Sequence, residues 1–173
     1  MERIPFGVRR LDTAIGGGAP PGSVVLLSGE AGAGSREFSY TAAAMSGLSF
    51  ADSELFTLYY GSEQSMPVEE VHYISLSASE RQIRKEMKLV MDDEIVDEGL
   101  SPVTFHDLSP EFFRLSPVPR EWYADRTIDI SQLGESQQRS GIAEALGNRL
   151  TRHAPGNLVV IDSLSDLAGT ETE

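Results

Sequence analysis

The chain contains no cysteine, only two lysines and no long hydrophobic run. The absence of cysteine excludes disulfide bonds, thiolate nucleophiles and cysteine-ligated zinc sites. No apolar stretch approaches the roughly 20 residues that a membrane-spanning helix needs. The N-terminal residues also lack the basic segment, apolar segment and small-residue cleavage site of a secretory signal. We therefore expect a cytoplasmic protein with no membrane partner.

Basic residues are few, and acidic residues outnumber them by 27 to 14, which gives a formal net charge of −13. Nonspecific nucleic-acid binding depends on basic side chains that displace counterions from phosphates. The sequence shows no basic cluster, so a nucleic-acid partner is not expected. Twelve arginines accompany only Lys85 and Lys88, a composition typical of proteins that stay soluble in concentrated salt. An ordinary acidic cytoplasmic protein is the alternative.

The hydrophobic pattern predicts one α/β domain. A length of 173 residues with 40% hydrophobic content is enough for a single packed core. Continuous apolar strands that alternate with helices indicate a parallel sheet covered on both faces. Strands are predicted at residues 23–28, 71–76, 103–105 and 157–162. Helices are predicted at residues 35–47, 77–96 and 132–153, and residues 109–125, which contain three prolines, are predicted to be irregular.

A glycine-rich loop stands between the first predicted strand and the helix that follows. In a phosphate-binding loop of the form G-x-x-x-x-G-K-[ST], backbone N–H groups and the helix N-terminus converge on an anion. The candidate nucleotide-binding residues are Gly29, Glu30, Ala31, Gly32, Ala33, Gly34, Ser35 and Arg36. Ser35 replaces the phosphate-binding lysine of the motif, and Arg36 replaces the hydroxyl that holds Mg²⁺. A glycine-rich connector without a ligand is the alternative reading of this octapeptide.

The flanking segments resemble the KaiC/RecA-like family of P-loop ATPases. Residues 7–12 (GVRRLD) and 15–29 (IGGGAPPGSVVLLSG) are similar to the segments that lead into the phosphate loop of that family, and residues 157–164 (NLVVIDSL) are similar to its Walker B strand. Within the family, the chain looks most like the haloarchaeal HTR-like proteins. The resemblance implies a RecA-like three-layer P-loop NTPase fold with a mainly parallel sheet. It also implies that Asp162 is the metal-site residue, which would order the water bound to Mg²⁺.

The departures from the family pattern point to a pseudoenzyme. The family places a pair of glutamates after its second strand, and this chain has Ser77 and Ala78 at those positions, with Glu80 displaced into the next predicted helix. Phosphoryl transfer depends on positioning and electrostatic stabilisation, so the loss of the lysine, the hydroxyl and the acid removes three of its supports. We therefore assign no catalytic residue. We expect at most weak ATP binding without hydrolysis, and Mg²⁺ only together with nucleotide.

The resemblance also predicts an incomplete sheet. In the family, the strand between the phosphate-loop strand and the Walker B strand comes later in the chain, whereas this sequence stops eleven residues past Asp162. We thus expect residues 1–166 to form an incomplete RecA/KaiC-like P-loop domain, truncated after the Walker B strand, and residues 167–173 to form a flexible tail. Unpaired strand edges favour association, so a protein partner or self-association is predicted.

The predicted function is that of a KaiC-like regulatory or interaction module in signal transduction. Two alternatives stay open. One is an active ATPase in which Arg36 replaces the missing lysine and another chain supplies the acid. The other is a RecA-like DNA-associated protein, which the net charge disfavours.

Other candidate sites are weak. His72, His106 and His153 lie far apart in the sequence and on different predicted elements, so a metal centre is not expected. The aromatic residues of the proline-containing segment are predicted to cap the core or the sheet edge, with a partner-binding patch as the alternative. These residues are Phe112, Phe113, Trp122 and Tyr123.

Overall fold

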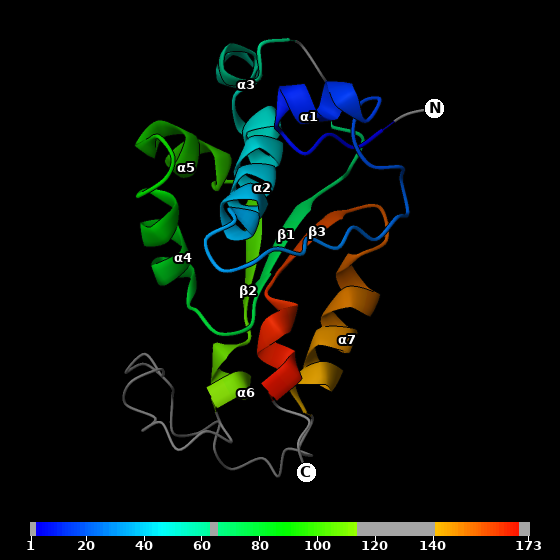
Figure 1. The fold of residues 1–173 in the computed structure, drawn as a ribbon, viewed down its shortest axis with the longest axis vertical. Coiled ribbons are helices and arrows are strands. Elements are labelled where there is room, and N and C mark those ends of the chain that lie inside the picture. Colours follow the sequence, from blue (N-terminus) through cyan, green and yellow to red (C-terminus); the bar gives the residue numbers. More distant parts are fainter. Residues whose placement is uncertain (1–2, 63–65, 114–140, 170–173) are drawn as a thin grey trace.

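A small open parallel sheet forms the centre of the molecule. The computed structural model describes residues 3–62, 66–113 and 141–169. Its sheet contains β1 (Val71–Ser75), β2 (Val103–Asp107) and β3 (Leu158–Asp162), in the order β2-β1-β3 with both pairs parallel (Figure 1). The predictions of strands at residues 71–76, 103–105 and 157–162 are thus confirmed.

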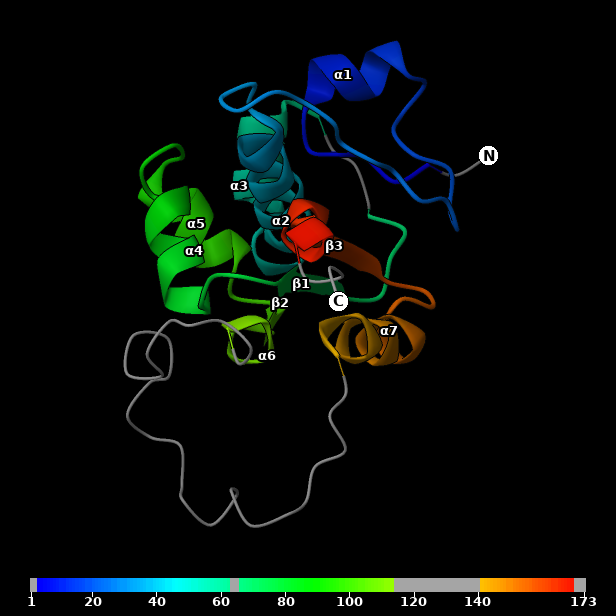
Figure 2. The same cartoon turned by 60° about the horizontal axis from the view of Figure 1, so that its bottom comes forward.

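Helices cover both faces of this sheet, which makes the fold a three-layer α/β arrangement. Figure 2 shows α2, α3, α4 and α5 on one side of the strands and α6 and α7 on the other. Side chains of β1 alternate between the two sides: Val71 and Tyr73 belong to one buried cluster, and Ile74 to the other. The helices are α1 (Arg9–Ala14), α2 (Ser35–Ala51), α3 (Ser53–Tyr60), α4 (Glu80–Met87), α5 (Asp93–Gly99), α6 (Ser109–Phe113) and α7 (Ile142–His153), and Leu164–Gly169 is a 3-10 helix.

Helix α2 begins at Ser35 as predicted but does not end at Gly47. It continues to Ala51 because Gly47 serves packing rather than helix termination. A Cβ atom at Gly47 would overlap the carbonyl oxygen of Gly99, the last residue of α5. A Cβ atom at Gly99 would in turn overlap the carbonyl oxygen of Ala44. Two glycines therefore allow the backbones of α2 and α5 to approach each other closely.

The prediction of one continuous helix at residues 77–96 is wrong. The structure has two short helices, α4 and α5, with a turn between them. Met87 ends α4, and Ile95 and Val96 lie in α5; all three are buried in the same cluster as Tyr73. The turn lets both helices place their apolar residues in that cluster, which one straight helix over the same residues would not do.

The strand predicted at residues 23–28 does not form. Within the described residues, no backbone hydrogen bond joins residues 24–28 to another segment. The apolar side chains are exposed instead, with Val24 at 98% and Leu26 at 73% of full accessibility. An apolar run supplies strand propensity, but a strand also needs a neighbour for its N–H and C=O groups. Among the described strands, β3 pairs with β1 alone, and residues 23–28 do not pair with its second edge.

The remaining predictions fall partly outside the described residues. The C-terminal part of the helix predicted at residues 132–153 is confirmed as α7, and residues 132–140 lie outside. Phe112 packs against the second buried cluster, as expected, whereas Trp122 and Tyr123 lie outside the described residues. None of the helices in the described ranges is both long and apolar enough to cross a lipid bilayer.

Candidate functional site

The glycine-rich loop leads directly into α2, as the motif requires. Gly32 and Gly34 have φ angles of 82° and 84°, values that favour glycine because L side chains rarely adopt them. The N–H of Ala33 donates to the carbonyl of Glu30 at 3.0 Å and closes a turn. Gly34 is the N-cap of α2, and no side chain caps that helix end. The loop therefore brings exposed backbone to the positive end of a 17-residue helix.

Arg36 lies in the first turn of α2 and contacts the carboxylate of Asp162. Its Nε atom lies 3.2 Å from Oδ1 and 3.1 Å from Oδ2 of Asp162. Asp162 ends β3 and is 4% exposed, whereas the side chain of Arg36 is 43% exposed. The hydroxyl of Tyr73 donates to Asp162 Oδ2 at 2.9 Å from the neighbouring strand. Two donors thus satisfy a buried carboxylate that would otherwise be costly to ionise.

The same arginine makes a second ion pair on its outer side. Arg36 Nη1 lies 3.3 Å from Oε2 of Glu86 in α4. The hydroxyl of Tyr40, one turn along α2 from Arg36, donates to that oxygen at 2.7 Å. The network therefore links α2, α4, β1 and β3 through one guanidinium group. The sequence analysis did not identify Tyr73, Tyr40 and Glu86 as members of this network. Only Tyr40 could have been found, because it lies four residues after Arg36 and positions i and i+4 share a helix face.

Burial and the neighbouring carboxylates keep both tyrosines protonated. Burial, followed by the charge of Asp162, raises the pKa of Tyr73 far above its ordinary value. Burial, followed by the hydrogen bond to Glu86, likewise raises the pKa of Tyr40. Both hydroxyls thus remain donors at neutral pH, and neither can act as a base there.

The positions after β1 carry no free carboxylate toward this site. The Ser77 hydroxyl donates to Asp166 Oδ2 at 2.8 Å, and the Ala78 N–H donates to Ser75 Oγ at 3.2 Å. Glu80 pairs with Arg84 of the same helix, with 2.8 Å between Oε1 and Nε. The structure thus places no acid at the positions where the resembling family has its glutamate pair.

Asp12, which the resemblance also included, has a structural role. It is 1% exposed and accepts from the Phe6 N–H at 2.8 Å and from the Tyr60 hydroxyl at 3.3 Å. Burial, followed by the charge of Asp12, raises the pKa of Tyr60 to about 12. This carboxylate therefore holds the N-terminal segment against α3 and lies outside the glycine loop.

The three histidines, which their sequence separation predicted to be apart, lie together. One nitrogen of each of His72, His106 and His153 falls within 4.8 Å of the others. They come from β1, β2 and the end of α7. The prediction failed because parallel pairing sets Ile74 beside His106, which places His72 and His106 on one face of the sheet, and α7 packs on that face.

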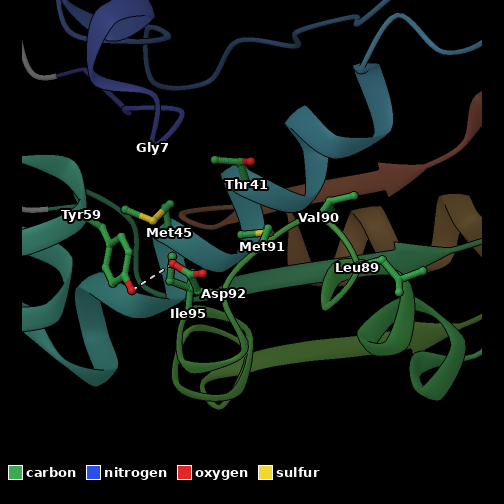
Figure 3. Close-up of a pocket in the computed structure, with 9 residues that line it drawn as sticks. All are labelled: Gly7, Thr41, Met45, Tyr59, Leu89, Val90, Met91, Asp92 and Ile95. Carbon is green, nitrogen blue, oxygen red and sulfur yellow. Dashed lines mark hydrogen bonds between the residues drawn. The ribbon is translucent and has the colours of Figure 1, made fainter.

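A pocket of about 550 Å³ lies away from the histidines, between the N-terminal segment, helices α2, α3 and α5, and the turn that joins α4 to α5 (Figure 3). Its lining mixes polar and apolar groups, and its one carboxylate, Asp92, accepts a hydrogen bond from the Tyr59 hydroxyl at 3.1 Å. No acid and base converge in this pocket, so its lining shows no evident catalytic arrangement. Its lining residues are Gly7, Thr41, Met45, Tyr59, Leu89, Val90, Met91, Asp92 and Ile95.

Comparison with known proteins yields no relative. No protein-family model matches the chain, and neither a curated protein nor a solved structure matches it significantly.

Proposed function

We propose that this chain is a RecA/KaiC-like interaction module that does not hydrolyse nucleotide. In this proposal, the Arg36–Asp162 ion pair replaces the Mg²⁺ site of an active P-loop ATPase. The contact between the Arg36 guanidinium and both oxygens of the Asp162 carboxylate is the observation that carries it. The open parallel sheet flanked by helices is compatible with a truncated RecA-like fold, and the glycine loop before α2 supports the P-loop part of the proposal. Residues 23–28 do not form the strand that precedes such a loop.

The electrostatics of the loop oppose a tightly held triphosphate. In an active site, a lysine would neutralise the phosphates, and a hydroxyl and the strand-end aspartate would serve the metal. Here, Ser35 supplies no charge, and Arg36 is already paired with Asp162 and Glu86. Glu30 adds negative charge within the loop, and Glu37 adds it in the first turn of α2. Backbone donors alone would then attract ATP weakly.

The same geometry weakens the case for an active ATPase. For Arg36 to take the role of the missing lysine, it would have to leave Asp162. Of the donors that the described residues supply to this carboxylate, which is 4% exposed, that movement would leave the Tyr73 hydroxyl. Breaking one partner of a buried pair is costly, so the observed pairing supports the inactive state.

The proposal of an interaction role rests on a run of exposed apolar side chains and on a strand edge that is unpaired within the described residues. Residues 24–27 are four consecutive apolar residues, each at least 41% exposed and outside the sheet. Among the described strands, β3 is paired along one edge only. An extended polypeptide can add to such an edge through main-chain hydrogen bonds and cover apolar neighbours with its side chains. We therefore propose a protein partner, or a second copy of this chain, as the occupant.

Nucleotide binding and turnover test the proposal together. Purified protein should bind Mg²⁺-ATP weakly or not at all and should release no phosphate above a buffer blank. Phosphate release on the order of 1 s⁻¹, the low end for ordinary enzymes, would overturn the proposal if Gly34→Asp and Asp162→Asn both abolished it. Loss in both variants would assign the activity to this chain and exclude a contaminating ATPase.

A repair variant sharpens this test. Ser35→Lys with Arg36→Thr restores the motif residues and frees Asp162 from its ion pair. Nucleotide affinity should rise in this double variant and should depend on Mg²⁺, whereas Ser35→Lys alone should gain less because Arg36 still holds Asp162. Equal affinity in the wild-type protein and the double variant would contradict a blocked phosphate loop.

A further inference from the structure

We propose that His72, His106 and His153 bind one Zn²⁺ ion, or a similar first-row transition-metal ion, with one coordination position open to solvent. His72 is 1% exposed, and the other two histidines are partly exposed. An ion can therefore reach the cluster from the surface while three protein ligands hold it from β1, β2 and α7. This site is separate from the glycine loop and does not depend on nucleotide.

The spacing of the nitrogen atoms suits such an ion after a small adjustment. Zn–N bonds of about 2.0–2.1 Å in a tetrahedral site place two ligand nitrogens roughly 3.4 Å apart. His72 Nδ1 and His106 Nε2 are 3.1 Å apart. The ring of His153 lies 4.7 Å from each of the other two rings, measured between centroids. His153 is the last residue of α7, so a change in its side-chain rotamer can bring its nitrogen closer without moving the sheet.

Glu70 orients the most buried ligand. Its Oε2 atom lies 3.0 Å from Nε2 of His72, and the side-chain nitrogen of Asn157 lies farther from that atom, at 3.3 Å. In the proposed site, Nε2 therefore carries the ring proton and donates to the nearer Glu70 carboxylate. The lone pair of His72 is then on Nδ1, the atom that faces His106. A carboxylate on the outer nitrogen of a ligating imidazole is the usual second-shell arrangement of histidine metal sites. Glu70 is thus assigned as a positioning residue.

Asn157 connects the end of α7 to the segment that leads into β1. Its side-chain amide donates to the backbone carbonyl of His153 at 2.9 Å, and its Oδ1 accepts from the Glu70 N–H at 3.0 Å. One side chain therefore fixes the end of α7 relative to the start of β1. This bracing holds the ligand-bearing segments in place before any ion binds.

The surroundings of His106 and His153 favour the neutral imidazoles that metal binding needs. Burial, followed by the charges of His153, His72 and Arg149, lowers the pKa of His106 to about 4. Burial, followed by His72, Arg152 and Arg149, lowers the pKa of His153. Neutral imidazoles are the form that binds a metal. Arg149 and Arg152 oppose an added cation, whereas the carboxylate of Glu70 favours it.

The donor set also selects the type of ion. Imidazole nitrogens suit Zn²⁺, Co²⁺, Ni²⁺ and Cu²⁺, whereas Mg²⁺ prefers oxygen ligands in octahedral geometry. An ion held by these three residues would link α7 to two strands of a three-stranded sheet. Its binding should therefore stabilise the folded chain.

Calorimetric titration with Zn²⁺ tests the proposal on protein that carries no polyhistidine tag and has been dialysed against a chelator. We expect one Zn²⁺ per chain, a higher thermal unfolding midpoint with Zn²⁺, and no such shift with an equal concentration of Mg²⁺. Co²⁺ should give the intense visible absorption of a tetrahedral site. Absence of stoichiometric Zn²⁺ binding, or a purely octahedral Co²⁺ spectrum, would overturn the proposal.

Variants separate this cluster from adventitious binding to acidic surface. His153→Ala should reduce Zn²⁺ affinity by at least about 100-fold, and Glu70→Gln by about 10–100-fold with the stoichiometry kept. Glu94→Gln, in the exposed first turn of α5, is the control and should leave the affinity unchanged. Circular dichroism confirms folding of each variant, and the partly exposed His153 still decides the test if buried His72 variants do not fold. Unchanged Zn²⁺ affinity in His153→Ala and His106→Ala would refute the assignment.

Discussion

Arg36 joins two segments that lie 126 residues apart in the sequence. Sequence comparison with the P-loop motif could identify both ends of this contact, because the arginine replaces a hydroxyl and the aspartate ends an apolar strand. It could not show that the two side chains meet, since that depends on how α2 packs against β3. The contact of Tyr73 with Asp162 could not be predicted either, because the pattern of a strand predicts a buried side chain but not its hydrogen-bond partner.

We predict that Arg36→Ala lowers the free energy of unfolding by about 1–3 kcal/mol. The variant removes a charged donor from a carboxylate that is 4% exposed, and an unsatisfied buried group costs about that much. The figure stays below that of a fully buried ion pair because the arginine side chain is 43% exposed. Chemical denaturation measures the loss.

The matched control for that variant is Arg81→Ala, at an exposed arginine of α4. It should change the free energy of unfolding by less than about 0.5 kcal/mol. Arg36→Ala combined with Asp162→Asn should be less destabilised than the sum of the two single changes, because the double variant leaves no unpaired charge. Strict additivity would show that the ion pair contributes nothing to stability.

Among the secondary-structure elements, β1, β2 and β3 were predictable, and the segment at residues 23–28 was not. All four segments are rich in β-branched or leucine side chains, which favour an extended backbone. Propensity alone cannot say whether a neighbouring strand is present. Among the described residues, β1, β2 and β3 are the strands that pair into a sheet. The prediction of a strand at residues 23–28 was therefore wrong, because β-propensity was taken as sufficient without a paired neighbour.

The charge pattern of the sequence indicates the break between α4 and α5, although the apolar periodicity alone predicts one continuous helix. Arg84 and Lys85 lie in the last turn of α4, and Asp93 and Glu94 in the first turn of α5. Basic residues favour a helix C-terminus and acidic residues a helix N-terminus. This reversal of charge marks a helix boundary, and it would have divided the predicted helix near residues 88–92.

At the contact of α2 with α5, we predict that Gly47→Ala is strongly destabilising, by more than about 2 kcal/mol. The added methyl group would overlap the Gly99 carbonyl and lie 2.9 Å from Val103 Cγ2, so backbone would have to move. Gly147→Ala is the matched control, because that exposed glycine of α7 has no atom within 4 Å of an added Cβ. It should stabilise the protein by about 0.5–1 kcal/mol through helix propensity.

Thermal unfolding of the two glycine variants separates these effects by sign. Gly47→Ala should lower the unfolding midpoint, and Gly147→Ala should raise it. A neutral Gly47→Ala variant would mean that α2 and α5 are not in close contact in solution.

For the molecule as a whole, net charge outweighs the ion pairs at the surface. The formal charge is −13, and the exposed ion pairs of the described residues include Arg84–Glu80 and Lys88–Asp97. Exposed pairs contribute about 0–1 kcal/mol each. Salt weakens these attractions, but it also screens the repulsion among the carboxylates, and acidic residues outnumber basic ones by 27 to 14.

We predict that the thermal unfolding midpoint rises with KCl concentration. The screening length falls from about 10 Å at 0.1 M to about 3 Å at 1 M, so repulsion between surface carboxylates should be largely removed over that range. A further rise above 1 M cannot come from screening and would indicate adaptation to concentrated salt. Differential scanning calorimetry from 0.1 to 3 M KCl measures the curve, with sucrose as the control for excluded-solute stabilisation. A midpoint that stays flat or falls would show that acidic repulsion does not limit the stability of this chain.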